Sequence, residues 1–175
     1  GALPPYENID TLKRLQEDIH NTNPSCVICL GDSFDDPLAE RSLSTNEIDS
    51  LKILQKGRDW IWISGNHDPY TSCKYGNYLN SFSKSAITFR HIALRGENGE
   101  ISGHYHPKIS LKLSNATVVR ACFIADQNKV IMPAYGTYTG GMSVRSNEIK
   151  ELVEPDAMVM LTGNKIRAVS YSACF

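Results

Sequence analysis

The chain has 175 residues, of which 41% are hydrophobic and 21% are charged, and its formal net charge is −1. These values are typical of one ordinary soluble domain and exclude the disordered and collagen-like classes. So small a net charge gives no overall attraction to nucleic acid or to an anionic membrane. A local basic surface would need residues such as Lys108, Lys112 and Arg120, for which scattered, solvated charges are the favoured interpretation.

Five cysteines, an odd number at low density, favour a reducing compartment, and the cytoplasm is the expected location. Cys26 and Cys29 form a C-x-x-C pair inside an apolar run, where an extended backbone would direct them to opposite faces. We interpret them as buried core thiols rather than as a redox or zinc pair. No run approaches 18 apolar residues, so no membrane span is expected.

The first half of the chain alternates predicted helices and strands. Apolar residues at spacings of three and four predict amphipathic helices, and short apolar runs predict strands that end in glycine-containing loops. One helix is expected over residues 11–19, capped by Asp10, and a second over 45–55. The strands are expected over 26–30 and 60–63. An irregular stretch is expected over 70–85.

Strand signals dominate the second half. Strands are expected over residues 87–91, 109–113, 117–125, 129–132, 157–161 and 165–171, with one short helix over 146–152. Turn residues such as Ser114-Asn115 predict antiparallel hairpins between several of them. The order of elements predicts a mixed α/β (α+β) protein with two sheets packed face to face under outer helices, in a single domain over residues 1–175.

Potential ligands follow several predicted strands. Glycine permits a tight turn there, and a rigid sheet holds the side chains that come next. Each short segment alone is most often an ordinary turn or strand face. Together they supply oxygen and imidazole ligands suited to Mn²⁺, Fe²⁺ or Zn²⁺. The segments are Gly31-Asp32, Gly65-Asn66-His67-Asp68, His91 and Gly103-His104-Tyr105-His106. The remaining histidine, His20, is expected to have no role.

In this order the segments resemble the signature of the calcineurin-like metallophosphoesterases, which contains GD, GNH(D/E), a lone His and GHxH. Within that family, residues 103–107 and 133–141 are most similar to the bacterial ligase-associated DNA damage-response phosphoesterases, an endonuclease subfamily. The resemblance implies a four-layer αββα sandwich of two mixed sheets flanked by helices. It also implies a hydrolytic site with two divalent metals, Mn²⁺ being the expected ion and Fe, Zn or Ni the alternatives.

The resemblance assigns a role to each residue. The metal ligands would be Asp32, Asn66, His91, His104 and His106. Asp32 would bridge the two ions, and a bridging hydroxide would attack phosphorus while the ions neutralise charge on the phosphoryl oxygens. His67 would act on the leaving oxygen as acid or charge stabiliser. Asp35 would orient His67, with Asp36 as an alternative.

One part of the family pattern is missing. The family begins with a strand bearing D-x-H, whose side chains hold the ion that His106 also binds, and no D-x-H precedes Gly31. One metal site is therefore expected to be incomplete, with the first strand absent. We favour an upstream segment missing from the sequence, since no methionine starts the chain, over a protein that uses one metal or none.

The expected activity is metal-dependent hydrolysis of a phosphodiester, and the family implies DNA or RNA as substrate and DNA-repair proteins as partners. A phosphomonoesterase or a cyclic-nucleotide phosphodiesterase would use the same metal core, so both stay open. From another class, a catalytically silent binding module would keep the fold without the first metal. The retained His67 and Asp35 argue against it, because an inert scaffold needs no leaving-group acid. A structural protein with core histidines is the last alternative.

Overall fold

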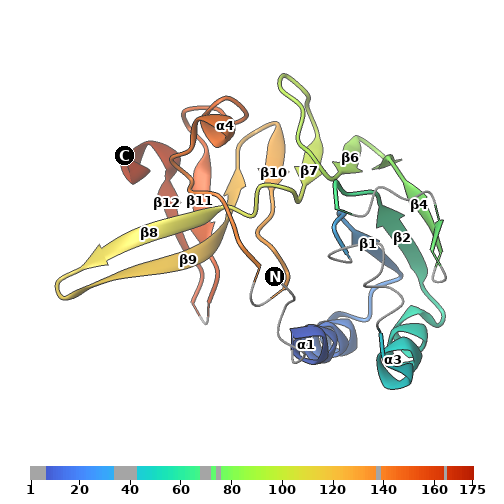
Figure 1. Cartoon of the computed structure of the whole chain (residues 1–175). Helices are drawn as coiled ribbons and strands as arrows, with labels where there is room; N and C mark the ends of the chain where they lie inside the picture. The colour runs from blue at the N-terminus through green and yellow to red at the C-terminus, as the bar shows by residue number, and fades with distance from the viewer. Residues whose placement is uncertain (1–6, 34–42, 68–71, 74–75, 137–138, 164) are drawn as a thin grey trace. The chain divides into compact units, whose positions relative to one another are not determined.

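The computed structural model describes residues 7–33, 43–67, 72–73, 76–136, 139–163 and 165–175. The chain divides into two compact units, which we call unit 1 (Gly1–Phe82 with Tyr135–Thr139) and unit 2 (Ser83–Ala134 with Gly140–Phe175). Over the described residues the strands form two sheets, and helices accompany both of them (Figure 1).

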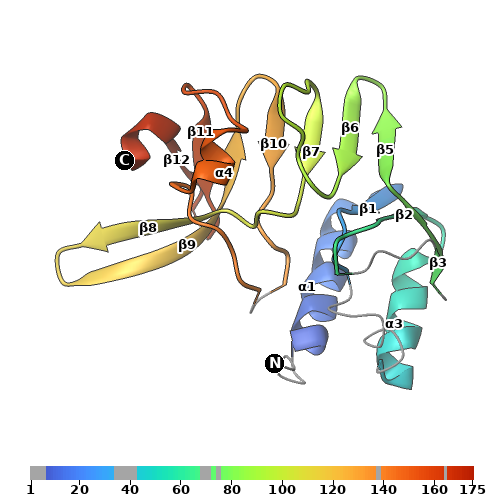
Figure 2. The ribbon, with the colours of Figure 1, turned by 45° about the horizontal axis from the view of Figure 1, so that its top comes forward.

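Unit 1 combines a small mixed sheet with two helices. Its strands are β1 (Cys26–Cys29), β2 (Asp59–Ile63), β4 (Gly76–Leu79) and β3 (Ser72–Cys73), in the order β1-β2-β4-β3. Helices α1 (Glu7–Thr22) and α3 (Thr45–Gln55) lie side by side (Figure 2). From α3, Leu51 packs against the buried rings of Trp62 and Tyr78. This small apolar cluster holds the helix on the sheet.

Helix α3 begins at a complete capping box. The Ser44 side chain accepts a hydrogen bond from the backbone N–H of Glu47, and the Glu47 carboxylate accepts one from the backbone N–H of Ser44, at 2.8 Å. Two of the N–H groups that a helix start leaves without an intrahelical partner are thereby satisfied. The helix therefore begins at Thr45, as predicted, with Ser44 as its N-cap.

Unit 2 contains the larger sheet. Its order is β12 (Arg167–Ser170), β11 (Met158–Leu161), β9 (Ala116–Ala125), β10 (Lys129–Ile131), β7 (Glu100–Ser102), β6 (Ile87–Arg90) and β5 (Ser81–Lys84), the last lying across the division between the units. Strand β8 (Lys108–Leu113) pairs with β9. The predicted hairpins β8–β9, β9–β10 and β11–β12 are confirmed as antiparallel pairs.

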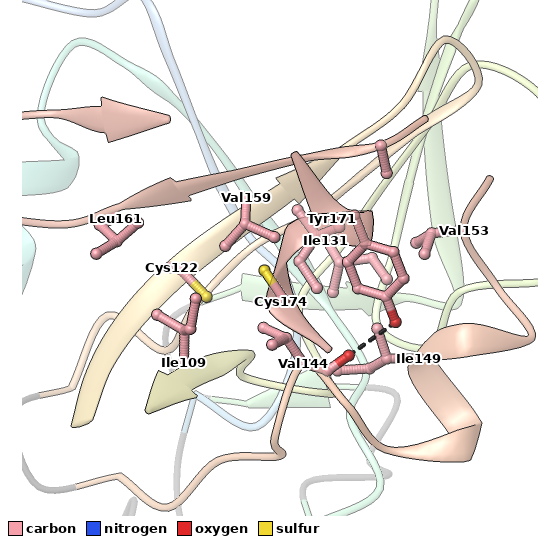
Figure 3. Packing of buried hydrophobic residues seen from close by; sticks show 12 residues of the cluster. Ile109, Cys122, Ile131, Val144, Ile149, Val153, Val159, Leu161, Tyr171 and Cys174 are labelled. Atoms are coloured by element: carbon pink, nitrogen blue, oxygen red, sulfur yellow. Dashed lines mark hydrogen bonds between the residues drawn. The ribbon is translucent and has the colours of Figure 1, made fainter. Parts of the chain in front are cut away.

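One apolar cluster fills unit 2 beneath the sheet. Ile124, Ile131 and Val159 come from the strands, and Ile149 comes from the short helix α4 (Asn147–Lys150) (Figure 3). The Tyr171 hydroxyl, at the start of the 3₁₀ helix η1 (Tyr171–Cys174), donates a hydrogen bond of 2.7 Å to the carbonyl of Val144. The cluster therefore ties the chain's last turn to the core.

Some predicted elements were wrong. The stretch over 70–85 contains β3, β4 and β5 rather than irregular structure. These strands are short and rich in glycine, serine and asparagine, so they lack the alternation that marks a strand in sequence. Strand β7 was not predicted either. Asp10 lies inside α1 instead of capping it, and Cys26 and Cys29 are half-buried cysteines outside any disulfide rather than fully buried ones.

Candidate metal centre

In unit 1, ligand candidates follow two adjacent strands. Strands β1 and β2 pair in parallel, with Cys29 opposite Trp62, so the segments that follow them leave the sheet at the same edge. Gly31 has φ of +93° and Asp32 has φ of +48°. Aspartate is among the few residues that enter the left-handed region at modest cost, because its short polar side chain bonds locally. The chain thus turns sharply at the Asp32 position.

The Asp32 carboxylate is held by the segment after β2. The backbone N–H of His67 donates a hydrogen bond of 2.8 Å to Asp32 Oδ1. A Cβ at Gly65 would lie 2.7 Å from Asp32 Cγ and would approach Asp32 Oδ1 and the Asp32 backbone nitrogen even more closely. Only glycine therefore permits this contact. Asp32 is half-buried, whereas Asn66 and His67 are exposed.

In unit 2, a second parallel pair presents the histidines. Arg90 at the end of β6 lies opposite Ser102 at the end of β7, and His91 and Gly103 are the next residues. The backbone N–H groups of Gly103 and His104 both donate to the carbonyl of His91, at 3.1 and 3.0 Å. This forked bond fixes the two strand ends against each other and so sets the spacing of the two rings.

His91 and His104 form a close pair of rings. His91 Nε2 lies 3.0 Å from His104 Nδ1, and the ring centroids are 4.8 Å apart at an interplanar angle of 73°. Two nitrogen ligands at right angles around an ion, with bonds of about 2.1 Å, would be separated by roughly 3.0 Å. The pair therefore fits as adjacent ligands of one divalent ion. His91 is buried, which keeps its ring in place.

His106 lies in a turn shaped by a second glycine contact. It has φ of +44° and is half-buried. A Cβ at Gly141 would collide with the His106 carbonyl oxygen, and Met142 bonds through its backbone to both Tyr105 (3.1 Å) and Lys108 (2.8 Å). The segment around Gly141 therefore runs directly along the His106 backbone. This contact gives a physical reason for glycine at position 141.

A buried ion cluster, which was not predicted, supports the His91 loop. The Glu100 carboxylate, 2% exposed, lies 3.1 Å from Arg90 Nε and 3.8 Å from Lys129 Nζ. It also accepts the backbone N–H of Leu94, and Lys129 Nζ donates to the Leu94 carbonyl at 2.6 Å. Two cations and one carboxylate thus hold Arg90, the residue before His91, and Leu94, three residues after it.

Tyr105 packs edge-on against His104, with 5.1 Å between the ring centroids. Burial raises the pKa of the Tyr105 phenol above its ordinary value, and the nearby carboxylates of Glu100 and Glu148 add to the shift. The hydroxyl therefore stays protonated at neutral pH. Its ring limits the positions that the His104 imidazole can adopt.

The predicted site residues are placed as follows. Unit 1 contains Asp32, Asn66 and His67, and the structure joins Asp32 to the His67 backbone. Unit 2 contains His91, His104 and His106, and the structure pairs the first two. The predicted orienting residue Asp35 and its alternative Asp36 lie outside the described residues. His20 is exposed in the last turn of α1.

Comparison with known proteins adds two findings. The family model described as calcineurin-like phosphoesterase matches residues 5–132. The crystal structure of Pseudomonas putida nuclease MPE superposes with a TM-score of 0.74 at 20% identity, covering 96% of this chain and 82% of that one. This likeness confirms the mixed α/β fold with two sheets flanked by helices.

No curated protein sequence matches the chain with significance. Among the described residues, no helix has the length and apolar character needed to cross a membrane.

Proposed function

We propose, from the premise that this chain belongs to the calcineurin-like phosphoesterase family, that its substrate is a phosphodiester of DNA or RNA. Family membership makes the chain a metal-dependent hydrolase of phosphoesters that uses divalent ions. The observation that carries the proposal is the His91–His104 pair, whose ring nitrogens have the separation expected of two ligands on one ion. The fold likeness to a nuclease supports the substrate class.

In this proposal residues 1–175 form one phosphoesterase domain with the predicted set of metal ligands. Those ligands are Asp32, Asn66, His91, His104 and His106, with Mn²⁺ as the ion. When bound, the divalent ions supply Lewis-acid stabilisation of the phosphoryl oxygens. Asp32 suits a ligand role because the His67 N–H and the Gly65 contact hold its carboxylate in one position.

His67 is the proposed leaving-group acid. Its backbone is fixed by the bond to Asp32, while its side chain is exposed and so accessible to a substrate. An imidazolium at this position would donate its proton to the leaving alkoxide and return to the neutral form. Asp35, outside the described residues, is proposed to orient the ring. Cytoplasmic location and DNA-repair partners complete the proposal.

Comparing good and poor leaving groups tests this assignment. The Mn²⁺-loaded chain should hydrolyse bis-p-nitrophenyl phosphate faster than p-nitrophenyl phosphate and should cleave a single-stranded oligonucleotide. His67→Ala should lower oligonucleotide cleavage by about 100-fold, because an alkoxide needs a proton to leave. It should lower bis-p-nitrophenyl phosphate hydrolysis far less, because nitrophenolate leaves unprotonated. His20→Ala is the matched control and should alter neither rate.

Three outcomes would contradict the proposal. Faster turnover of the monoester would indicate a phosphomonoesterase. Absence of turnover on every ester, with metal bound, would indicate a silent binding module. An equal loss on both diesters in His67→Ala would remove the leaving-group role.

A further inference from the structure

The β8–β9 hairpin extends beyond the sheet of unit 2. Residues 122–125 of β9 pair with β11, whereas residues 116–121 pair, among the described strands, with β8 alone. Figure 1 shows the resulting two-stranded ribbon, in yellow, reaching past the other strands. Lys112, Thr117 and Arg120 are exposed on it. The ribbon thus presents side chains that the sheet does not cover.

A groove of about 280 Å³ lies along this ribbon. Its apolar lining comes from the edge of the unit 2 core, to which Ile109 and Cys174 belong (Figure 3). Its polar lining consists of two hydroxyls and two cations. The lining residues are Ile109, Ser110, Leu111, Lys112, Thr117, Arg145, Ala173 and Cys174. An apolar floor beside cations and hydroxyls suits a ligand with a flat organic part and a phosphate.

The two cations of the groove are not neutralised within the described part of the chain. The ion pairs found there use other lysines and arginines, and the groove lining includes no carboxylate. Arg145 Nε donates to the carbonyl of Cys174, which anchors the guanidinium at the groove wall. Its terminal N–H groups face no described acceptor at hydrogen-bond distance. Such a fixed, planar fork matches the oxygens of a phosphate.

We infer that this groove binds a backbone phosphate and the adjoining nucleoside of a single-stranded nucleic acid. The inference rests on the proposed function for the identity of the ligand, and it adds Lys112 and Arg145 as substrate-binding residues separate from the proposed metal ligands. The volume is at the small end of ligand sites and accommodates about one nucleotide. The apolar floor contacts a base or sugar without reading its sequence. This assignment gives a local basic site to a protein whose net charge is only −1.

Binding measured without turnover tests the inference. A fluorescein-labelled 12-nucleotide thymidine oligonucleotide is titrated with the full chain in EDTA, by fluorescence anisotropy at several salt concentrations. The double variant K112Q/R145Q should weaken binding about fivefold or more. It should also reduce the slope of log K against log salt by about 0.7, the contribution of the one single-strand phosphate that the groove holds. A matching uridine RNA should behave alike.

The control K84Q/R167Q removes the same charge from exposed positions on β5 and β12 and should bind like the wild type. Arg145 also anchors η1, so its replacement could alter the structure around the groove. A second pair of variants therefore leaves Arg145 in place: Lys112→Glu should weaken binding, and Lys84→Glu is its control. Thermal unfolding shows whether each variant is folded.

The inference is overturned if K112Q/R145Q binds like the wild type, if the control loses as much affinity, or if the wild type does not bind. Thymidine monophosphate competing as well as the oligonucleotide would also overturn it, by indicating a free-nucleotide site. Hydrolysis takes no part in the assay. A chain that binds through the groove but cleaves no ester would contradict the proposed function alone.

Discussion

The loops after β1 and β2 differ from the loops after β6 and β7 in what holds them. In unit 1, Asp32 is placed by backbone features: a positive φ, the close approach of Gly65 and one N–H bond from His67. In unit 2, His91 is buried, and the ion cluster around Glu100 holds its neighbours Arg90 and Leu94. Both arrangements position a ligand beyond a strand end. We therefore expect different substitutions to disrupt them. In unit 1 a side chain added at Gly65 should displace Asp32, and in unit 2 loss of the Glu100 charge should destabilise the His91 loop.

Removing the Glu100 charge should have the largest effect. Glu100→Gln leaves the buried Lys129 and the half-buried Arg90 without their carboxylate, which should lower the free energy of unfolding by about 3–5 kcal/mol. Urea unfolding followed by circular dichroism measures this change. Glu97→Gln, in an exposed loop, is the control and should have little effect. A loss for Glu100→Gln as small as that of the control would show that the cluster does not support the His91 loop.

Adding a methyl group at Gly65 should break the unit 1 arrangement. Gly65→Ala places Cβ against the Asp32 carboxylate and backbone, so the carboxylate must shift. Misplacing a catalytic group by about 1 Å costs on the order of 100-fold in rate, and Mn²⁺-dependent hydrolysis should fall accordingly. Gly140→Ala, where Cβ would meet nothing within 4 Å, should keep the wild-type rate. Similar rates for both variants would remove the steric argument.

The strands that precede the candidate ligands could be predicted from the sequence, whereas the contacts that hold those ligands in place could not. Strands β1 and β2 are apolar runs that end at glycine, and both signals are local. Glu100 lies in the run Glu97 to Ser102, in which only Ile101 is apolar, so the pattern is typical of a surface segment. Its burial depends on partners from β6 and β10. The collision that a Cβ at Gly65 would cause involves Asp32, which is distant in sequence. Contacts between residues far apart in the chain leave no recognisable pattern in a single amino-acid sequence.

The candidate ligands were identified as residues, but their geometry needed the structure. The segment Gly103-His104-Tyr105-His106 marks histidines without saying which ring meets His91. The parallel register of β6 and β7 decides that, since it brings His91 beside Gly103 and His104. Strand β7 itself was not predicted, because three residues are too few to show a period.

A smaller effect is expected at the start of α3. Ser44→Ala removes the hydroxyl that accepts the Glu47 N–H, and loss of such a cap costs about 1 kcal/mol. The urea midpoint should fall correspondingly, whereas Ser114→Ala, in the exposed β8–β9 turn, should leave it unchanged. Equal midpoints for both variants would mean that packing of Leu51 alone sets the stability of the helix.

The last effect concerns alkaline pH in unit 2. Burial raises the pKa of the Cys122 thiol from 9.0 to about 12. The folded state therefore favours the neutral thiol, and this stabilisation is complete below pH 9 and declines as pH rises toward 12. The urea midpoint should fall over that range, and less steeply in Cys122→Ala. Identical slopes for the variant and the wild type would assign the decline to other groups, such as Tyr171, whose pKa burial also raises to about 12.

Metal content is the most direct test of the central claim that His91 and His104 bind one divalent ion. The wild type, the double variant H91A/H104A and the control H20A are loaded with Mn²⁺, freed of unbound ion and assayed by mass spectrometry, with urea unfolding in parallel. We predict that the wild type and H20A retain Mn²⁺ and that the double variant loses it. If the double variant instead keeps the metal content of H20A and is only less stable, the two histidines are core residues and the claim is wrong.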